Sequence, residues 1–174
     1  MIHHDAVSDK RQAFDGVIPD NASAVLDGWL FDDAHYYAFL VQFEDTDAGG
    51  IVYHANYLSF AERGRSAWLR LIGVSQDENL YDRKMGFVVR RASLSYFSPL
   101  RLGDEVIVET RLKDISKARI TAEQLIISAQ QVKKEPDGHI FAKVEVEIVM
   151  VNEGGRPIRF PLSMLEKMSA NTKS

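Results

Sequence analysis

Along this chain the hydrophobic positions follow two different periods. Residues 35–44 (HYYAFLVQFE) alternate imperfectly between aromatic or β-branched and more polar side chains, as a strand with one buried face does. Residues 56–72 instead carry apolar side chains on one stripe at helical spacing, and Gly73 follows where a helix commonly ends. The strand period then returns in four segments: residues 86–99, 104–115, 118–133 and 139–152.

Short connections join these four predicted strands, residues 99–103, 116–117 and 135–138, and an equally short turn, residues 153–155, follows the last strand. Since a crossover between parallel strands needs a dozen or more residues, the four strands are expected to be antiparallel and joined by hairpins. The predicted class is α+β, in which a curled antiparallel sheet of about five strands wraps around the long helix, with Trp68 at the centre of the core. Residues 162–168 are expected to add a short helix.

Two features of these elements carry further expectations. Gly64 lies inside the predicted helix, where glycine costs about 1 kcal/mol relative to alanine, so another element is expected to pack close to it. Four charged residues are expected at the sides of the helix or opposite its apolar stripe: Glu62, Arg63, Arg65 and Arg70. A curled sheet also leaves edge strands that dimerisation would cover, so a homo-oligomer is expected.

The composition is that of a globular protein. At 174 residues, with 45% apolar and 26% charged residues, the chain suits one domain with a sizeable core. No apolar run approaches the roughly 18 residues of a membrane span, so we expect a soluble protein that does not span a membrane. The absence of cysteine excludes disulfides, thiolate nucleophiles and cysteine metal sites. The N-terminus lacks the pattern of a secretory signal, which makes the cytoplasm the expected location.

Charge divides the chain into two unequal parts. The net charge is −4, but residues 1–34 alone hold seven Asp against Lys10 and Arg11, which leaves a slight positive excess on the remainder. Such a body does not repel a phosphorylated ligand, yet it lacks the basic excess typical of nucleic-acid binders, so no nucleic-acid partner is expected. Residues 1–34 are interpreted as an acidic, partly disordered extension, whose segment 24–31 (AVLDGWLF) is apolar enough to dock, and residues 35–170 as the folded domain.

Candidate chemistry concentrates in residues 43–60 (FEDTDAGGIVYHANYLSF), where the first strand breaks into an acidic turn that leads into the helix. The N–H groups at a helix start together carry about half a positive charge, and they can polarise a carbonyl that a neighbouring carboxylate attacks. This layout indicates an acyl-transfer site. The neighbouring acids Glu44 and Asp45 also suggest a metal site as an alternative, but no matching cluster of His or Asp ligands accompanies them. Asp45 is expected to cap or orient the turn instead, with the Thr46 hydroxyl bonding to the same backbone.

The run EDTDAGGIVYHANYLSFAERGR closely resembles the signature of the hotdog-fold acyl-CoA thioesterases, specifically the YbgC type associated with Tol-Pal operons, within the 4-hydroxybenzoyl-CoA thioesterase family. The resemblance continues more loosely through residues 86–106 and covers about residues 36–160. It implies a hotdog fold, a dimer or a tetramer of dimers, and hydrolysis of acyl-CoA or acyl carrier protein thioesters. It implies no metal or redox cofactor.

The same resemblance assigns roles to individual residues. The second Asp of the DTD triplet, Asp47, matches the catalytic carboxylate, and His54 matches a position at the helix start whose backbone N–H faces the thioester carbonyl. In this type of enzyme the His side chain is also taken as part of the active site. Gly64 departs from the family's ERAR pattern, which has Ala there; the difference concerns helix packing and not the chemistry.

Each assignment has a structural alternative. Asp47 acts either as the nucleophile or as a general base, and its alternative is a plain turn residue. Gly49 and Gly50 are expected to allow positive φ and close approach of the ligand, whereas Tyr53 and Asn56 either line the pocket or only pack. The imidazole of His54 has the alternative of a local hydrogen bond.

Three arginines are candidates for contacts with the CoA phosphates. Arg90 and Arg91 are adjacent on a strand and are expected to point to opposite faces, with a solvated sheet edge as the alternative. Arg65 on the helix has the alternative of an ion pair with Glu62. The remaining histidines, His3, His4, His35 and His139, have no partners at informative spacing and are expected on the surface.

Two rival functions remain open. A hotdog hydratase or dehydratase shares the fold, but its usual pairing of a His with a helix acid is not found here. The other rival is an acyl-binding or scaffold protein of the Tol-Pal or division machinery with incidental hydrolase activity, for which the acidic extension and residues 24–31 would be the contact segment.

Overall fold

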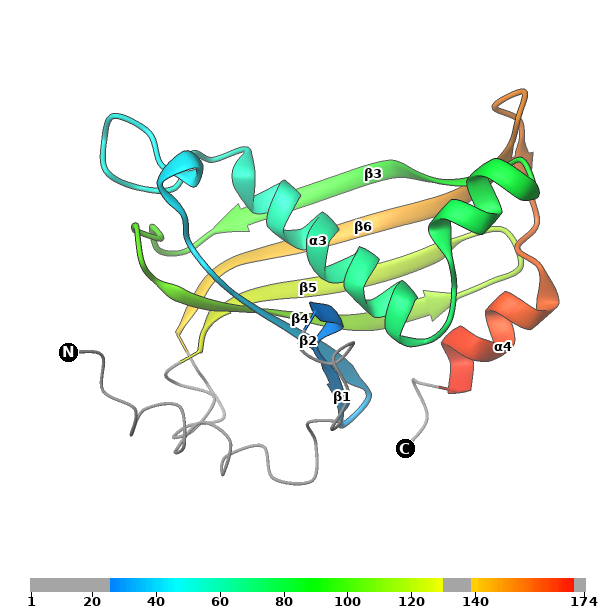
Figure 1. Cartoon of the computed structure of the whole chain (residues 1–174), viewed down its shortest axis with the longest axis horizontal. Coiled ribbons are helices and arrows are strands. Elements are labelled where there is room, and N and C mark those ends of the chain that lie inside the picture. Colours follow the sequence, from blue (N-terminus) through cyan, green and yellow to red (C-terminus); the bar gives the residue numbers. More distant parts are fainter. Residues whose placement is uncertain (1–25, 130–138, 171–174) are drawn as a thin grey trace.

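The computed structural model describes residues 26–129 and 139–170 (Figure 1). In chain order the elements are β1 (Trp29–Phe31), β2 (Ala34–Leu40), the 3-10 helix η1 (Phe43–Asp45), α3 (Asn56–Leu71), the π-helix η2 (Glu78–Asp82), β3 (Met85–Tyr96), β4 (Glu105–Ile115), β5 (Ile120–Ser128), β6 (Ile140–Asn152), β7 (Pro157–Ile158) and α4 (Leu162–Ala170). The connection between β5 and β6, where the hairpin at residues 135–138 was expected, lies outside the described residues, as do most of residues 1–34.

One antiparallel sheet forms the body of the molecule. Its strands follow the order β1-β2-β4-β5-β6-β3, and the two-residue strand β7 pairs with β6. The long helix α3 lies across one face of this sheet (Figure 1). The predicted α+β class and the hotdog arrangement of a curled sheet around one helix are confirmed, with β1 and β7 as short additions.

The connection between β3 and β4 is not the predicted hairpin. β3 pairs with β6 along eleven residue positions, and β4 pairs with β2 and β5, so these two consecutive strands lie three positions apart in the sheet. Eight residues, 97–104, join them, and an extended chain of that length reaches about 26 Å, whereas three strand spacings require only about 14 Å. A connection that is too short for a parallel crossover is therefore still long enough to cross one end of the sheet.

Helix α3 confirms both glycine expectations. A Cβ added to Gly64 would lie 2.8 Å from Val108 Cγ1, so β4 does pack against the helix at this point. At the C-terminus Gly73 has φ +72°, and the N–H groups of Gly73 and Val74 donate to the carbonyls of Arg70 (2.9 Å) and Leu69 (2.8 Å). This pair of bonds closes the last turn as a Schellman motif.

The core between α3 and the sheet consists of two clusters. The larger one surrounds Phe60, which is completely buried, and includes Val106 and Val108 on β4. Trp68, expected at the centre, lies in the second cluster with residues of α4 such as Met164 and Met168. The helix that follows Pro161 therefore closes the end of the core that α3 alone leaves open.

The first described residues pack on the edge of the sheet. Trp29 is buried and its ring stacks on Tyr36 with centroids 5.8 Å apart, while Asp27 pairs with Arg70 of α3 at 2.7 Å. His35 lies beneath them at 1% exposure, with Nε2 2.6 Å from the carbonyl oxygen of Asp27. The expectation that His35 is a surface residue is therefore wrong, because the preceding segment folds back over it. His139 is exposed, and His3 and His4 lie outside the described residues.

Candidate active site

The acidic turn between β2 and α3 is held by its own backbone. Thr46 and Val52 form an isolated antiparallel bridge, the Asp47 N–H donates to the Ile51 carbonyl (2.9 Å), and the Gly50 N–H donates to the Asp47 carbonyl (3.0 Å). Gly50 has φ +73°, as expected for a residue that reverses the chain, whereas Gly49 has no positive φ. The turn thus presents Asp47 at its first corner.

The Asp47 side chain is exposed, and one of its two carboxylate oxygens accepts a hydrogen bond. Its Oδ1 accepts the Gly49 N–H at 2.8 Å, a bond that restricts the side-chain rotamer. No group among the described residues bonds to its Oδ2. One oxygen therefore fills the local turn role while the other faces solvent.

Asp45 supports this turn from inside. It is 3% exposed, and its carboxylate accepts the Gln42 N–H at 2.8 Å. Its carbonyl oxygen accepts bonds from the Tyr53 N–H and from Asn56 Nδ2, both at 2.9 Å. The Thr46 hydroxyl donates to the Phe43 carbonyl (2.9 Å). The orienting role expected of Asp45 is confirmed, and Asn56 contributes its side chain to the same support.

The start of α3 is open on the side of the turn. Its N-cap residue, Ala55, has no side chain that could bond to the first N–H groups. The His54 N–H has no acceptor in the part of the chain that the structure describes. The His54 and Tyr53 side chains are exposed, and their rings lie 4.3 Å apart. Backbone donors and the carboxylate of Asp47 therefore occur on the same short segment.

Residues that the sequence did not single out fix this segment to the rest of the fold. The Tyr96 hydroxyl donates to the His54 carbonyl (2.9 Å), the Val52 N–H donates to the Leu100 carbonyl (2.8 Å), and the Leu100 N–H donates to the Tyr57 hydroxyl (3.0 Å). Nothing in the sequence pattern relates residues so far apart, because the contacts arise only where the end of β3 and the crossing of residues 97–104 meet the helix start.

Arg65 faces the sheet. It is 8% exposed, its guanidinium donates to Gln124 Oε1, and it forms an ion pair with Glu62. Gln124 in turn donates to the Ala61 carbonyl (2.8 Å) and to the Thr110 hydroxyl (2.9 Å). The expectation that Arg65 lies beside or opposite the apolar stripe is wrong, because polar partners in the sheet make a buried guanidinium acceptable there.

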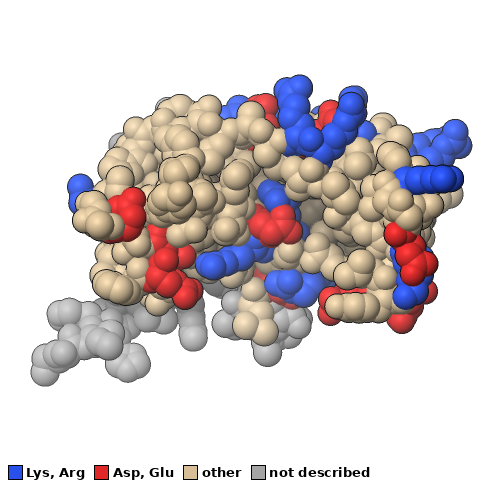
Figure 2. Space-filling view, turned by 90° about the horizontal axis from the view of Figure 1, so that it is seen from above, with Lys and Arg blue, Asp and Glu red and all other residues tan. Residues whose placement is uncertain are grey.

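A hollow runs between α3 and β3. An open groove bordered by Leu58, Ser59 and Val89 shares Glu62 and Arg65 with a cavity of about 80 Å³ that ends against Trp68 and Met168. The deeper wall is mainly apolar: Leu69, Phe87, Leu112, Ile120, Ala122 and Ile148. Figure 2 shows this face of the molecule hollowed near its middle, beside acidic and basic side chains. The hollow begins in the first turn of α3, the helix that follows the acidic turn in the chain.

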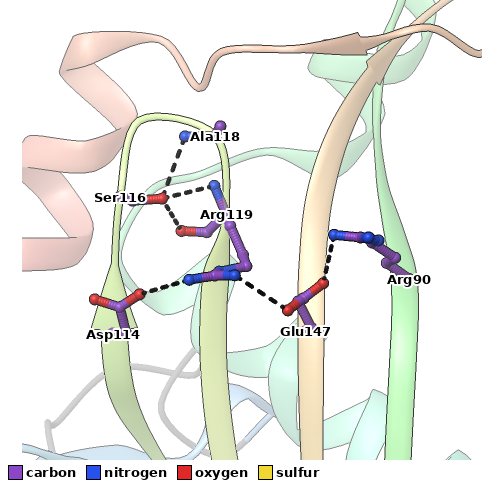
Figure 3. A network of polar contacts seen from close by, with 6 residues as sticks. All are labelled: Arg90, Asp114, Ser116, Ala118, Arg119 and Glu147. Carbon is purple, nitrogen blue, oxygen red and sulfur yellow. Dashed lines mark hydrogen bonds and ion pairs between the residues drawn. The ribbon is translucent and has the colours of Figure 1, made fainter.

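Arg90 and Arg91 differ in their surroundings. The pairing of β3 with β6 is irregular between Val89 and Arg91, so the simple alternation of faces does not hold there. Arg90 pairs with Glu147 at 3.1 Å, and Glu147 also lies 3.5 Å from Arg119 (Figure 3). Arg91 is exposed and has no ion-pair partner among the described residues. Of the two, Arg91 has the side chain available for a phosphate.

Two further properties concern the kind of site that is present. Within residues 26–129 and 139–170 no three His, Asp or Glu side chains are grouped as metal ligands would be. In the same residues no helix has both the length and the apolar character needed to cross a bilayer.

Comparison with known sequences places the chain in a family. The sequence model of the thioesterase-like superfamily matches residues 41–168. The chain is 32% identical over 133 residues to the acyl-CoA thioesterase YbgC of Haemophilus influenzae. This alignment covers 76% of the present chain and 92% of the relative. It is 39% identical over 112 residues to the acyl-CoA thioester hydrolase YbgC of Escherichia coli O6:H1, covering 64% of this chain and 78% of the relative.

Comparison with solved structures agrees. The crystal structure of a probable thioesterase from Bartonella henselae superimposes with a TM-score of 0.63 at 33% identity, over 74% of this chain and 99% of the other. The chain therefore belongs to the thioesterase-like superfamily, and it is a hotdog-fold thioester hydrolase related to the YbgC acyl-CoA thioesterases.

Proposed function

We propose that this protein hydrolyses acyl-CoA thioesters, with Asp47 as the reacting carboxylate and the N–H groups at the start of α3 polarising the thioester carbonyl. The observation that carries the proposal is the acidic turn itself. Its backbone bonds fix Asp47 with one free carboxylate oxygen, seven residues before a His54 N–H that has no acceptor in the described chain.

Two routes lead from this arrangement to products. In the first, a carboxylate oxygen of Asp47 attacks the thioester carbon, CoA leaves as a thiolate that takes up a proton, and water opens the resulting anhydride. In the second, Asp47 removes a proton from a water molecule that attacks the carbonyl directly. Both consume one water and yield a carboxylic acid and CoA. In both, negative charge gathers on the carbonyl oxygen, where an N–H donor contributes about 10²- to 10³-fold to turnover.

We assign the acyl group to the hollow between α3 and β3. The open groove starts beside Leu58 in the first turn of α3 and leads past the Glu62–Arg65 pair to the apolar cavity against Trp68. Gly50 and Tyr53 line the approach to Asp47 in this proposal, and Asn56 supports it through Asp45. Arg91 is the candidate for a CoA phosphate, because Arg65 and Arg90 are engaged in ion pairs.

We further propose that the working form is a homo-oligomer, a dimer or a pair of dimers. In a single chain Asp47 and His54 are open to solvent, whereas a hydrolase gains from an enclosed site in which electrostatic interactions are strong. β3 is an edge strand of twelve residues on which Val88 and Val89 are 42% and 43% exposed. A second copy placed against β3 would cover this edge and the groove beside it.

The proposal is tested by release of CoA from purified protein. Because the chain contains no cysteine, a thiol-reactive chromophore reports only the CoA that hydrolysis releases. We expect Asp47→Asn to lower kcat by at least about 10³-fold with the melting temperature unchanged, since the amide cannot act as nucleophile or base. Hydrolysis by Asp47→Asn at the wild-type rate would refute the assignment.

The same assay in H₂¹⁸O with limiting substrate tests for the anhydride route. General-base catalysis places the label in the first-formed acid, as does an anhydride opened at the acyl carbon, so label on Asp47 is the decisive result. An anhydride opened at the aspartyl carbon leaves the label on Asp47, where the mass of the peptide reports it.

A partner-binding role for the N-terminal segment is the second candidate. It is favoured by the exposure of Leu26 (70%) and Phe31 (56%) beside the buried Trp29. A chain beginning at residue 26 keeps β1 and the Asp27–Arg70 pair, so it is the suitable truncation. Loss of captured Tol-Pal or division proteins with hydrolysis retained would support an added scaffold role; unchanged capture would exclude residues 1–25 from it.

A further inference from the structure

The side chain of Tyr96 connects the edge of the sheet to the peptide that precedes α3. Tyr96 is the last residue of β3, and its hydroxyl donates to the carbonyl oxygen of His54 at 2.9 Å, across 42 positions in the sequence. A bond at the carbonyl oxygen restricts rotation of the peptide that follows His54. The Ala55 N–H belongs to that peptide, so its direction is restricted with it, and the His54 N–H lies one peptide earlier.

The helix has no side-chain cap at its N-terminus. Helix starts are commonly fixed by a Ser, Thr, Asp or Asn side chain that bonds to the first N–H groups. Here the N-cap residue is Ala55, with no side-chain cap. A bond to the carbonyl of His54 restrains this segment without using any of its N–H groups.

The Tyr96 ring is itself held in place. It meets the Tyr57 ring edge-on, with centroids 5.2 Å apart and planes at 88°. Tyr57 is 3% exposed, and its hydroxyl accepts the N–H of Leu100, whose carbonyl accepts the N–H of Val52. Two neighbouring tyrosines therefore fix this segment at two points. Tyr57 bonds to Leu100, which bonds to Val52, and Tyr96 bonds to His54.

The hydroxyl of Tyr96 is a dependable donor. Tyr96 is 49% exposed, but desolvation of its hydroxyl still raises its pKa above the usual tyrosine value, so the proton stays on the oxygen throughout the neutral range. The His54 carbonyl, which can only accept, is the complementary partner.

We propose that Tyr96 is a positioning residue of the hydrolytic site, which holds the peptide between His54 and Ala55 so that the Ala55 N–H, and with it the neighbouring His54 N–H, is directed toward the thioester carbonyl. This inference rests on the proposed function. Tyr96 acts through the backbone of residues 52–57 and has no role in proton transfer or in binding the acyl group.

The test is Tyr96→Phe, which keeps the ring against Tyr57 and removes only the hydroxyl. We expect kcat to fall about tenfold, less than the loss of an oxyanion donor outright, because the N–H remains but is less well aimed. KM and the melting temperature should stay within error of wild type. The fall should be the same for acyl chains of every length, since the carbonyl is common to all of them.

Tyr81→Phe is the matched control. Tyr81 lies in η2, is 68% exposed and has no hydrogen-bond partner among the described residues, so this variant should keep wild-type kcat. A wild-type kcat for Tyr96→Phe would overturn the inference, as would a change confined to KM or to the preferred acyl length.

Hydrogen exchange separates this inference from the proposed function. In Tyr96→Phe the amides of residues 52–57 should exchange faster than in wild type, with the rest of the chain unchanged, and equal exchange would overturn the positioning role. This measurement needs no turnover, so it decides the role of Tyr96 even if Asp47→Asn proves fully active.

Discussion

At position 54 the group expected to act on the substrate is the backbone N–H, which no side-chain substitution removes. We therefore expect His54→Ala to retain activity within about tenfold of wild type, far above Asp47→Asn. Steady-state CoA release measures both variants. If His54→Ala is as inactive as Asp47→Asn, the imidazole takes part in the chemistry and the backbone assignment is insufficient.

His35 makes the stability of the fold depend on pH. Burial lowers its pKa from 6.5 to about 4, so between these values the unfolded chain binds a proton that the folded chain does not. The contribution of the neutral, buried His35 to the free energy of unfolding is therefore fully present above pH 6.5. It falls by on the order of 3 kcal/mol as the pH drops toward 4. Urea unfolding at pH 7 and pH 4.5 measures this loss. In His35→Gln, whose amide can still donate to the Asp27 carbonyl, the loss should be smaller; an equal loss would assign it to other groups.

Residue roles were predictable from the sequence where they depend on near neighbours. The tasks of Asp45 and Thr46 follow from a turn whose bonds span at most eleven positions. The burial of Arg65 was not predictable, because it depends on Gln124, 59 positions away. The same holds for His35, which a segment without clear periodicity covers.

At the scale of the elements, α3 packs so closely on β4 that no side chain fits between Gly64 and Val108. We expect Gly64→Ala to destabilise the fold by about 1–3 kcal/mol, because the new methyl group would overlap Val108 Cγ1 and this clash outweighs the gain in helix propensity. Chemical denaturation measures the free energy of unfolding.

Val108→Ala supplies the control for this substitution. Alone it leaves a small cavity and destabilises the protein, but combined with Gly64→Ala it should cost less than the sum of the two single changes. Additive costs would mean that Val108 does not limit residue 64. The presence of Gly64, where the family pattern has Ala, would then have no steric explanation.

The helix and strands were predicted well because their periodicity is a local property of the sequence. The order of the strands in the sheet was not predicted. The long helix and the strands β3, β4 and β6 lie within a few residues of their predicted bounds. The hairpin expected between β3 and β4 is instead a crossing of the sheet. A loop length excludes some connections but does not choose between a neighbouring strand and one three positions away.

At the scale of the whole molecule, the proposed assembly depends on β3. We expect a homodimer by light scattering, and we expect Val88→Lys to shift it toward monomer, because a twofold contact would bring two like charges into the covered edge. CoA release should fall with dissociation if the second copy encloses the site. Glu145→Lys, on the adjacent strand β6, is the control for added charge. A Val88→Lys protein that stays dimeric would place the interface elsewhere.

The crossing of residues 97–104 also has a consequence for the time course of folding. The bonds that fix the helix start join positions 42 to 48 apart, through Tyr96 at the end of β3 and Leu100 in the crossing, so they are expected to form only once the two strands that the crossing joins are in place. In refolding experiments we therefore expect helix and strand signals to return before CoA release does. A chain caught halfway along its folding path would have α3 and much of the sheet, yet it would not hydrolyse thioesters.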